Sequence, residues 1–260
     1  MQPQLSSLIL GLAKPYSRWI ERHSQASFSN EDTHIDPTPF LGIQDAVACL
    51  THLSGAFIFA VLGTGLIQRG QGDSLRVAAL VIYVSGVVSA VLLSGLMHLV
   101  DRDSGARSVL VRLDQAAIFF LIAATYTPVH IIQFRGWMRW GVLVAIWTAA
   151  TAGMILYLAF IDSVPERLSL TFYLVLGWAG LFTAIALHRA VGFKPLIPIV
   201  LGALAYTIGA LIDVSALPDF VPGLIRPHEV FHLFVLAGVA SHWVYIRKIT
   251  IFAPITDLYA

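Results

Sequence analysis

His228 and His232 are four residues apart, a spacing that could let a single helix bind a metal ion. Residues at positions i and i+4 lie on the same face of a helix, so both imidazoles can point to one ion. His98 is a third candidate ligand, and Ser94 precedes it by four residues on the same expected face. Three neutral imidazoles with an open fourth position are the ligands of a catalytic zinc site, where the pKa of the bound water falls to about 7. We therefore predict a Zn²⁺ site at His98, His228 and His232.

Carboxylates near these histidines could complete the site. Asp114 is predicted to orient or deprotonate the bound water, and the Ser94 hydroxyl is predicted to stabilise it. An imidazole that binds a metal also needs a partner for its other ring nitrogen. Asp45, Asp114 or Glu229 could be that partner. For His52, such a contact and a purely structural hydrogen bond are both open.

The composition indicates what kind of chain must position these residues. Hydrophobic residues make up 57% of the sequence and charged residues 12%, and the mean hydropathy is +0.79. A soluble domain carries about 25% charged residues, so this chain cannot cover a water-facing surface. The formal charge is +1 without a basic tract, which argues against nucleic acid as a partner. The predicted fold class is an all-α integral membrane protein.

Seven apolar segments are long enough to cross a bilayer, which takes about 20 helical residues. They predict a seven-transmembrane helix bundle over 41–250, with a polar N-terminal tail over 1–40 and a C-terminal tail over 251–260. We expect this multi-pass protein in the plasma (inner) membrane. The predicted spans are 46–67, 78–99, 115–134, 138–160, 170–190, 195–215 and 229–249.

The direction of the spans brings the candidate residues to one depth. Span 2 ends, and spans 1, 3 and 7 begin, at the face that carries the N-terminal tail, so the three histidines and Asp114 share a level. Every acidic residue except Asp73 and Asp257 falls on this face. Lys and Arg near the span ends are more numerous on the opposite face, which favours a cytoplasmic C-terminus. Ionisable groups are costly in a bilayer and usually mark function there.

Purely structural explanations compete with the site. Histidines near a membrane boundary often only form hydrogen bonds between helices. Asp114 could favour a helix N-terminus through the macrodipole, and Ser94 could be a small packing residue. His242 follows His228 by 14 residues and lies about 21 Å away along a helix, so a packing or hydrogen-bonding role is expected for it. The agreement in depth favours the metal site over these explanations.

At these residues the sequence resembles the hemolysin III family, the bacterial branch of the progestin and adiponectin receptor group. The resemblance covers roughly 41–250, with Asp45, Met97, Gln115 and Ala124 standing where the family usually has Glu, an aromatic residue, His and Gly. None of these departures removes a candidate metal ligand. The sequence elements that carry the resemblance are DAVACLTHLSG at 45–55, Ser94-x3-His98, Arg112-Leu113-Asp114 with IAATYTP at 122–128, GALAYTIG at 202–209, and His228-x3-His232 with His242.

The resemblance implies seven helices and a zinc ion near the N-terminal face, held by His98, His228 and His232 with Asp114 and Ser94 beside the bound water. The wider superfamily includes alkaline ceramidases, which hydrolyse lipid amides. Adiponectin receptors place the N-terminus in the cytoplasm, which conflicts with the distribution of Lys and Arg here.

Three functional hypotheses follow. The leading one is a zinc-dependent hydrolase of a lipid amide or ester bond, with a membrane lipid as substrate or ligand. The second is a receptor-like or regulatory protein with a structural zinc. The third is a pore or transporter in which Asp and His side chains line an ion path.

Overall fold

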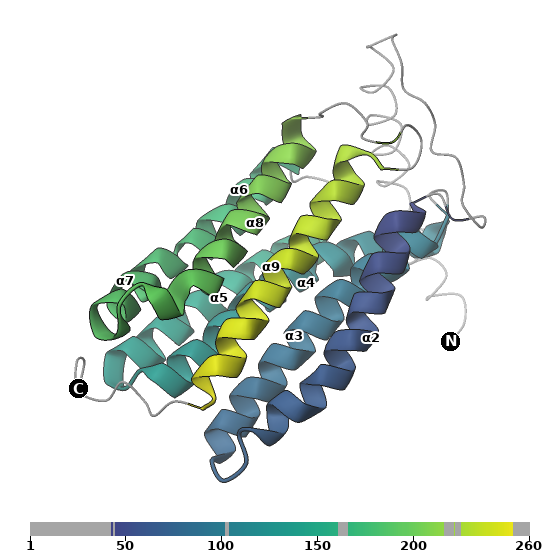
Figure 1. Cartoon of the computed structure of the whole chain (residues 1–260). Coiled ribbons are helices and arrows are strands. Elements are labelled where there is room, and N and C mark those ends of the chain that lie inside the picture. The colour runs from purple at the N-terminus through teal and green to yellow at the C-terminus, as the bar shows by residue number, and fades with distance from the viewer. Residues whose placement is uncertain are drawn as a thin grey trace, which may run out of the picture.

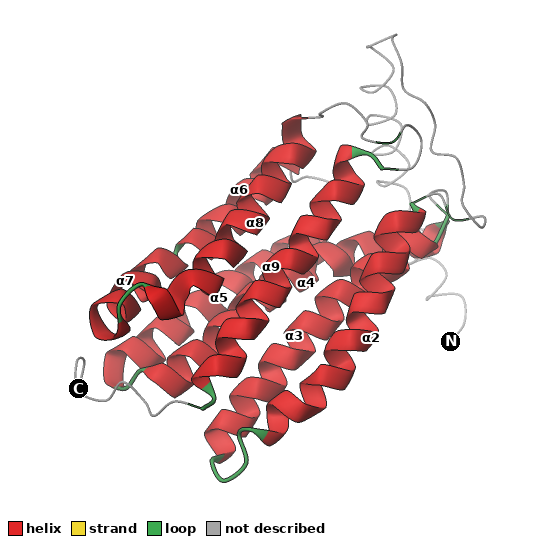
Figure 2. Cartoon of the chain, in the orientation of Figure 1, coloured by secondary structure: helices red, strands yellow, loops and turns green. Residues whose placement is uncertain are grey.

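The computed structural model describes residues 43, 45–101, 104–160, 166–215, 221 and 225–251, with the side chains of 166 and 167 excepted. The tails predicted over 1–40 and 251–260 lie outside these residues, apart from Ile251. Helices account for nearly all of the described chain, and Figure 2 shows no strand in that part, where only an isolated bridge joins Val221 and Ile225. The helices are α2 (Ala46–Gln68), α3 (Ser74–Leu99), α4 (Gly105–Gln133), α5 (Gly136–Phe160), α6 (Glu166–Trp178), α7 (Gly180–Val191), the 3₁₀ turn η2 (Lys194–Leu196), α8 (Ile197–Ser215) and α9 (Pro227–Ile249).

These helices form seven membrane spans, which confirms the predicted fold class. Each span is at least 22 residues long and apolar enough to cross a bilayer. α6 and α7 together make the fifth span, Leu168–Val191, and a turn at Ala179 separates them. The chain is therefore a multi-pass integral membrane protein with a seven-helix bundle (Figure 1).

The third span begins ten residues earlier than predicted. The Ser104 hydroxyl accepts a hydrogen bond from the Ala106 backbone N–H at 3.1 Å, so α4 starts at Gly105. Arg107 holds this first turn against α3 by donating to the carbonyl oxygens of Met97 and Val100, at 3.0 and 2.8 Å. Asp114 therefore lies well inside α4. The macrodipole acts within the first turn of a helix, so it does not explain Asp114.

The bundle packs around two apolar clusters. One joins α2, α3, α4 and α9, where Phe59 and Tyr83 contact the Trp243 indole with ring centroids 5.1 and 5.6 Å apart. The other joins α4 and α5 around Phe119 and Tyr157. Helices α3 and α4 approach closely because Gly86 faces Ala124, where an added Cβ would lie 2.5 Å from the alanine Cβ. Small residues allow such approach between membrane helices.

The alternating direction of the spans places several helix ends at one level of the bundle. The starts of α2, α4 and α9 and the ends of α3 and α8 lie at the upper right end in Figure 1. All of the candidate site residues except Asp114 lie within about two turns of these ends. Side chains more than 180 residues apart in the sequence can therefore meet at this end of the bundle.

Candidate metal centre

The three predicted ligands converge on one point. The Nε2 atom of His232 lies 2.9 Å from His98 Nε2 and 3.0 Å from His228 Nε2. The three ligand atoms all lie within 4.8 Å of one another, although His98 is on α3 and the other two are on α9. Two nitrogens that bind one zinc ion tetrahedrally at about 2.05 Å are about 3.3 Å apart. The spacing therefore suits a shared metal ion.

Each of the three rings has a partner for its other nitrogen. His98 Nδ1 lies 3.1 Å from Asp45 Oδ2, and His228 Nδ1 lies 3.0 Å from Asp213 Oδ1. A carboxylate oxygen only accepts, so both Nδ1 atoms carry the hydrogen. The Nε2 atoms of these neutral rings then present lone pairs to the centre.

A relay of two rings assigns the same tautomer to His232. The carbonyl oxygen of Ala48 accepts from His52 Nδ1 at 3.2 Å, so the Nε2 atom of a neutral His52 is an acceptor. His232 Nδ1 lies 3.3 Å from that atom and donates to it, which leaves a lone pair on His232 Nε2. When all three rings are neutral in this tautomer, three lone pairs face one another with no hydrogen between them. This arrangement is repulsive without a cation and fits a divalent metal ion that prefers imidazole.

Two arginines hold the Asp45 carboxylate. Arg226 Nη2 donates to Asp45 Oδ1 at 2.6 Å, and Arg107 Nη2 donates to Asp45 Oδ2 at 3.4 Å. Glu229 accepts from both the backbone N–H and the guanidinium of Arg226, at 3.0 and 2.8 Å. Burial opposes the charge of Arg226, but the hydrogen bonds and charges of Glu229 and Asp45 outweigh it and raise the pKa of Arg226. This ion network ties the starts of α2, α4 and α9 together beside the histidines.

Ser94 and Asp114 add polar groups to the buried surroundings of the histidines. Ser94 lies one turn before His98 on α3, and its buried hydroxyl has no hydrogen-bond partner among the described residues. Asp114 is 7% exposed and lies close enough to His228 and Arg107 to interact electrostatically with both. A buried polar group without a partner is costly. A bound water or a substrate oxygen would satisfy the hydroxyl.

The chain matches the family model described as haemolysin-III related over residues 42–243. This range covers most of the chain and contains all of the residues above. The protein belongs to the hemolysin III family, within the progestin and adiponectin receptor group.

Relatives of this hemolysin III protein occur in bacteria and eukaryotes. It is 29% identical to Hemolysin-3 of Bacillus cereus over 202 residues, which is 76% of this chain and 87% of the relative. It is 28% identical to the human monocyte to macrophage differentiation factor over 216 residues, which is 79% of this chain and 84% of the relative. The heptahelical transmembrane protein ADIPOR2 of rice is 28% identical over 181 residues, or 63% and 78% of the two chains.

The structure brings nearly all of the predicted residues of this hemolysin III protein to one place. Asp45 and His52 contact candidate ligand histidines directly, and Glu229 binds Arg226, which in turn binds Asp45. His242 lies apart, and its Nδ1 atom donates to the Gly238 carbonyl at 3.0 Å.

Three contributors had no assigned role in the sequence-based site: Asp213, Arg226 and Arg107. Asp213 lies near the end of the predicted sixth span, 195–215. The sequence signal that could have revealed Asp213 was its membrane depth, because the end of the sixth span lies at the same level as the three histidines. Arg226 could have been noticed because it lies two residues before His228 in a chain with few charges.

Asp213→Ala should weaken zinc binding without removing a ligand. The substitution takes away the acceptor that holds His228 Nδ1–H, and loss of such a partner lowers metal affinity by about 10–100-fold. Competition with a zinc-binding dye in detergent measures the dissociation constant. Asp101→Ala is a matched control, because Asp101 is exposed at the same end of the bundle. An unchanged dissociation constant in Asp213→Ala would contradict the role of Asp213.

Proposed function

We propose that this protein is a zinc-dependent hydrolase of an amide or ester bond in a membrane lipid. The observation that carries the proposal is the convergence of three imidazole nitrogens, from two helices, beside a buried hydroxyl and a buried carboxylate. Zinc held in this way supplies a water that ionises near neutral pH. His98, His228 and His232 would hold the ion, and Asp45, His52 and Asp213 would fix the rings.

Two further residues would act on the reacting groups. Asp114 would orient the attacking water and accept its proton, because it is a buried carboxylate in electrostatic contact with His228. The Ser94 hydroxyl would donate to the water or to the oxyanion that develops on the lipid carbonyl. The location of the site favours a lipid substrate, since all of these groups lie in or next to membrane spans.

A receptor-like protein with a structural zinc is the second candidate. Helix α9 packs mainly on α8, and its contacts with α2 and α4 are fewer. A metal ion shared by His98 on α3 and His232 on α9 would therefore pin two halves of the bundle. This reading explains the ligands and the ion network equally well, but it assigns no task to Ser94 or Asp114.

Metal removal separates the two candidates. Chelation should abolish turnover of a ceramide-like lipid amide in mixed micelles, and added zinc should restore it. The helices should persist because their backbone hydrogen bonds are internal, so the far-UV circular dichroism should keep its amplitude. Unfolding of the bundle on chelation would favour the structural zinc. Zinc-replete protein that is inert toward amides and esters of every lipid class tested would overturn the hydrolase proposal.

A further inference from the structure

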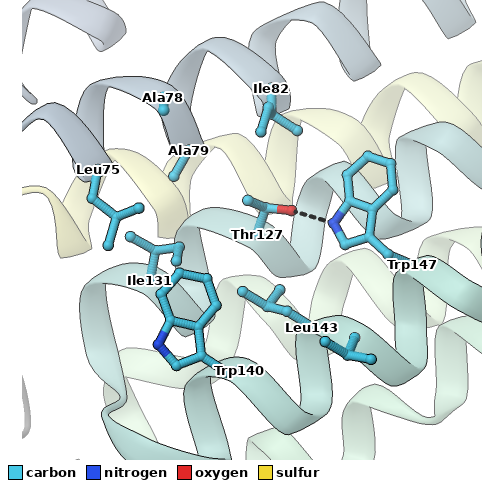
Figure 3. A pocket seen from close by; sticks show the side chains of 10 residues that line it. Leu75, Ala78, Ala79, Ile82, Thr127, Ile131, Trp140, Leu143 and Trp147 are labelled. Atoms are coloured by element: carbon cyan, nitrogen blue, oxygen red, sulfur yellow. Dashed lines mark hydrogen bonds between the residues drawn. The ribbon is translucent and has the colours of Figure 1, made fainter.

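An apolar groove opens at the other end of the bundle from the histidines (Figure 3). Helices α3, α4 and α5 border it, and its volume is about 300 Å³. Leu75 lies at its outer end in the first turn of α3, and Trp147 lies about two turns deeper along α5 than Trp140. All three helices are membrane spans, and the lining residues Leu75, Trp140 and Val144 are exposed, so the groove faces the lipid bilayer.

Thr127 and Trp147 place polar atoms in the groove, and these atoms are already paired. The Trp147 indole N–H donates to Thr127 Oγ1 at 3.1 Å, and the Thr127 hydroxyl donates to the Ala123 carbonyl at 2.9 Å (Figure 3). The remaining lining is aliphatic or aromatic carbon, apart from the indole N–H of Trp140. A hydrocarbon chain fits this surface, whereas a polar headgroup would lose its hydrogen bonds there.

Positive charge surrounds the outer end of the groove. Among the described residues there, Arg76 on α3, Arg135 just before α5 and Arg139 in the first turn of α5 contribute three guanidiniums, against the carboxylate of Asp73. Arg76 Nε lies 3.7 Å from Asp73 Oδ2, and Arg139 is close enough to Arg135 and Asp73 to interact electrostatically with both. The surplus of positive charge is complementary to a phosphate group, and basic residues beside membrane helices bind anionic headgroups.

Two exposed tryptophans mark the level of the headgroups. Trp137 and Trp140 are 78% and 51% exposed, in the first two turns of α5. Indoles gather where the bilayer meets water. A second apolar hollow of about 480 Å³ shares Trp140 and Val144 with the groove and extends toward Trp137 and Gly141. The two hollows flank Trp140, which matches a lipid that has two chains.

We propose that this surface binds one anionic phospholipid. Its phosphate lies among Arg76, Arg135 and Arg139, one acyl chain lies in the groove between α3, α4 and α5, and the second chain lies beyond Trp140. The site is independent of the metal centre and of the proposed hydrolase activity, because it is at the opposite end of the bundle.

Quenching by brominated lipids tests the headgroup. Full-length protein in a nonionic detergent is titrated with phosphatidylglycerol or phosphatidylcholine that carry the same brominated chains, which quench nearby indoles. Phosphatidylglycerol should half-quench at a lower concentration, and added salt should reduce the difference. Arg139→Gln should weaken this preference about fivefold. Arg247→Gln is the matched control, because Arg247 is exposed at the same end of the bundle on α9.

A second pair of variants tests the groove itself. Ala78→Leu fills the groove from its exposed α3 wall and should weaken quenching by both lipids, whereas Ala60→Leu on the exposed face of α2 should not. Equal quenching by the two headgroups, or equal effects of the members of either pair, would overturn the proposal. A second copy of the chain in the groove would also overturn it, and would appear as a dimer mass that Ala78→Leu converts to a monomer mass.

Discussion

His232→Ala should remove stoichiometric zinc from the purified protein. His232 is the central ligand, with its Nε2 atom 2.9 Å from that of His98 and 3.0 Å from that of His228. Without it, two imidazoles from different helices remain, and the His52 relay no longer reaches the ion. The loss of affinity should exceed the about 10–100-fold expected for the loss of an outer hydrogen-bond partner. Metal analysis of protein purified in detergent measures the zinc content.

A histidine on the same helix provides the control for this experiment. His242→Ala should keep near-stoichiometric zinc, because His242 binds a backbone carbonyl of its own helix and lies far from the centre. His228→Ala should lose zinc as well, and it is a milder change because the His228 side chain is 41% exposed. Far-UV circular dichroism checks that each variant keeps its helices. A full equivalent of zinc in folded His232→Ala or His228→Ala would contradict the ligand assignment.

Asp114→Asn should lower the rate of lipid-amide hydrolysis by about 10²–10⁴-fold while the zinc content stays at the wild-type level. The amide has almost the same shape as the carboxylate, but it cannot accept a proton from the attacking water. Asp114 is not among the three histidines that could hold a metal ion, so zinc binding should not depend on it. Single-turnover measurement with zinc-saturated protein in mixed micelles isolates the chemical step.

Two comparisons make the result specific to Asp114. Asp101→Asn removes a carboxylate charge at the same end of the bundle and should leave the rate unchanged, because Asp101 is exposed. Ser94→Ala should reduce the rate through the loss of one hydrogen-bond donor and should also keep its zinc. An Asp114→Asn rate within about threefold of wild type would exclude Asp114 as the general base, since such a base contributes far more.

The number of spans and the three candidate metal ligands followed from local patterns. Apolar stretches of bilayer length set the count of seven, because no water-facing fold can tolerate them. The His228 and His232 pair followed from the helical period. The depth of His98 followed from counting crossings, since four spans separate it from His228 and an even number of crossings returns the chain to the same face.

The boundaries of α4 did not follow from hydropathy. The turns before Asp114 carry Arg107 and Arg112, which interrupt the apolar stretch. Hydropathy therefore predicts a span that begins at 115. These turns are helical because Arg107 donates to two carbonyls at the end of α3 and Arg112 donates to the Leu158 carbonyl at 3.4 Å. These contacts join residues from different helices, so no pattern within the segment could reveal them.

By itself, the sequence determined a seven-helix membrane bundle that carries three histidines at one depth, because length, apolarity and helical period are local properties of the chain. Only the tertiary structure decided which carboxylate serves which ring. Asp213 serves His228, Asp45 serves His98, and Glu229 supports Arg226. These pairings depend on how α2, α8 and α9 rotate and pack against one another. A hydrogen bond forms or fails within a few tenths of an ångström, whereas a helical sequence pattern fixes a side chain only to a helix face and a membrane depth.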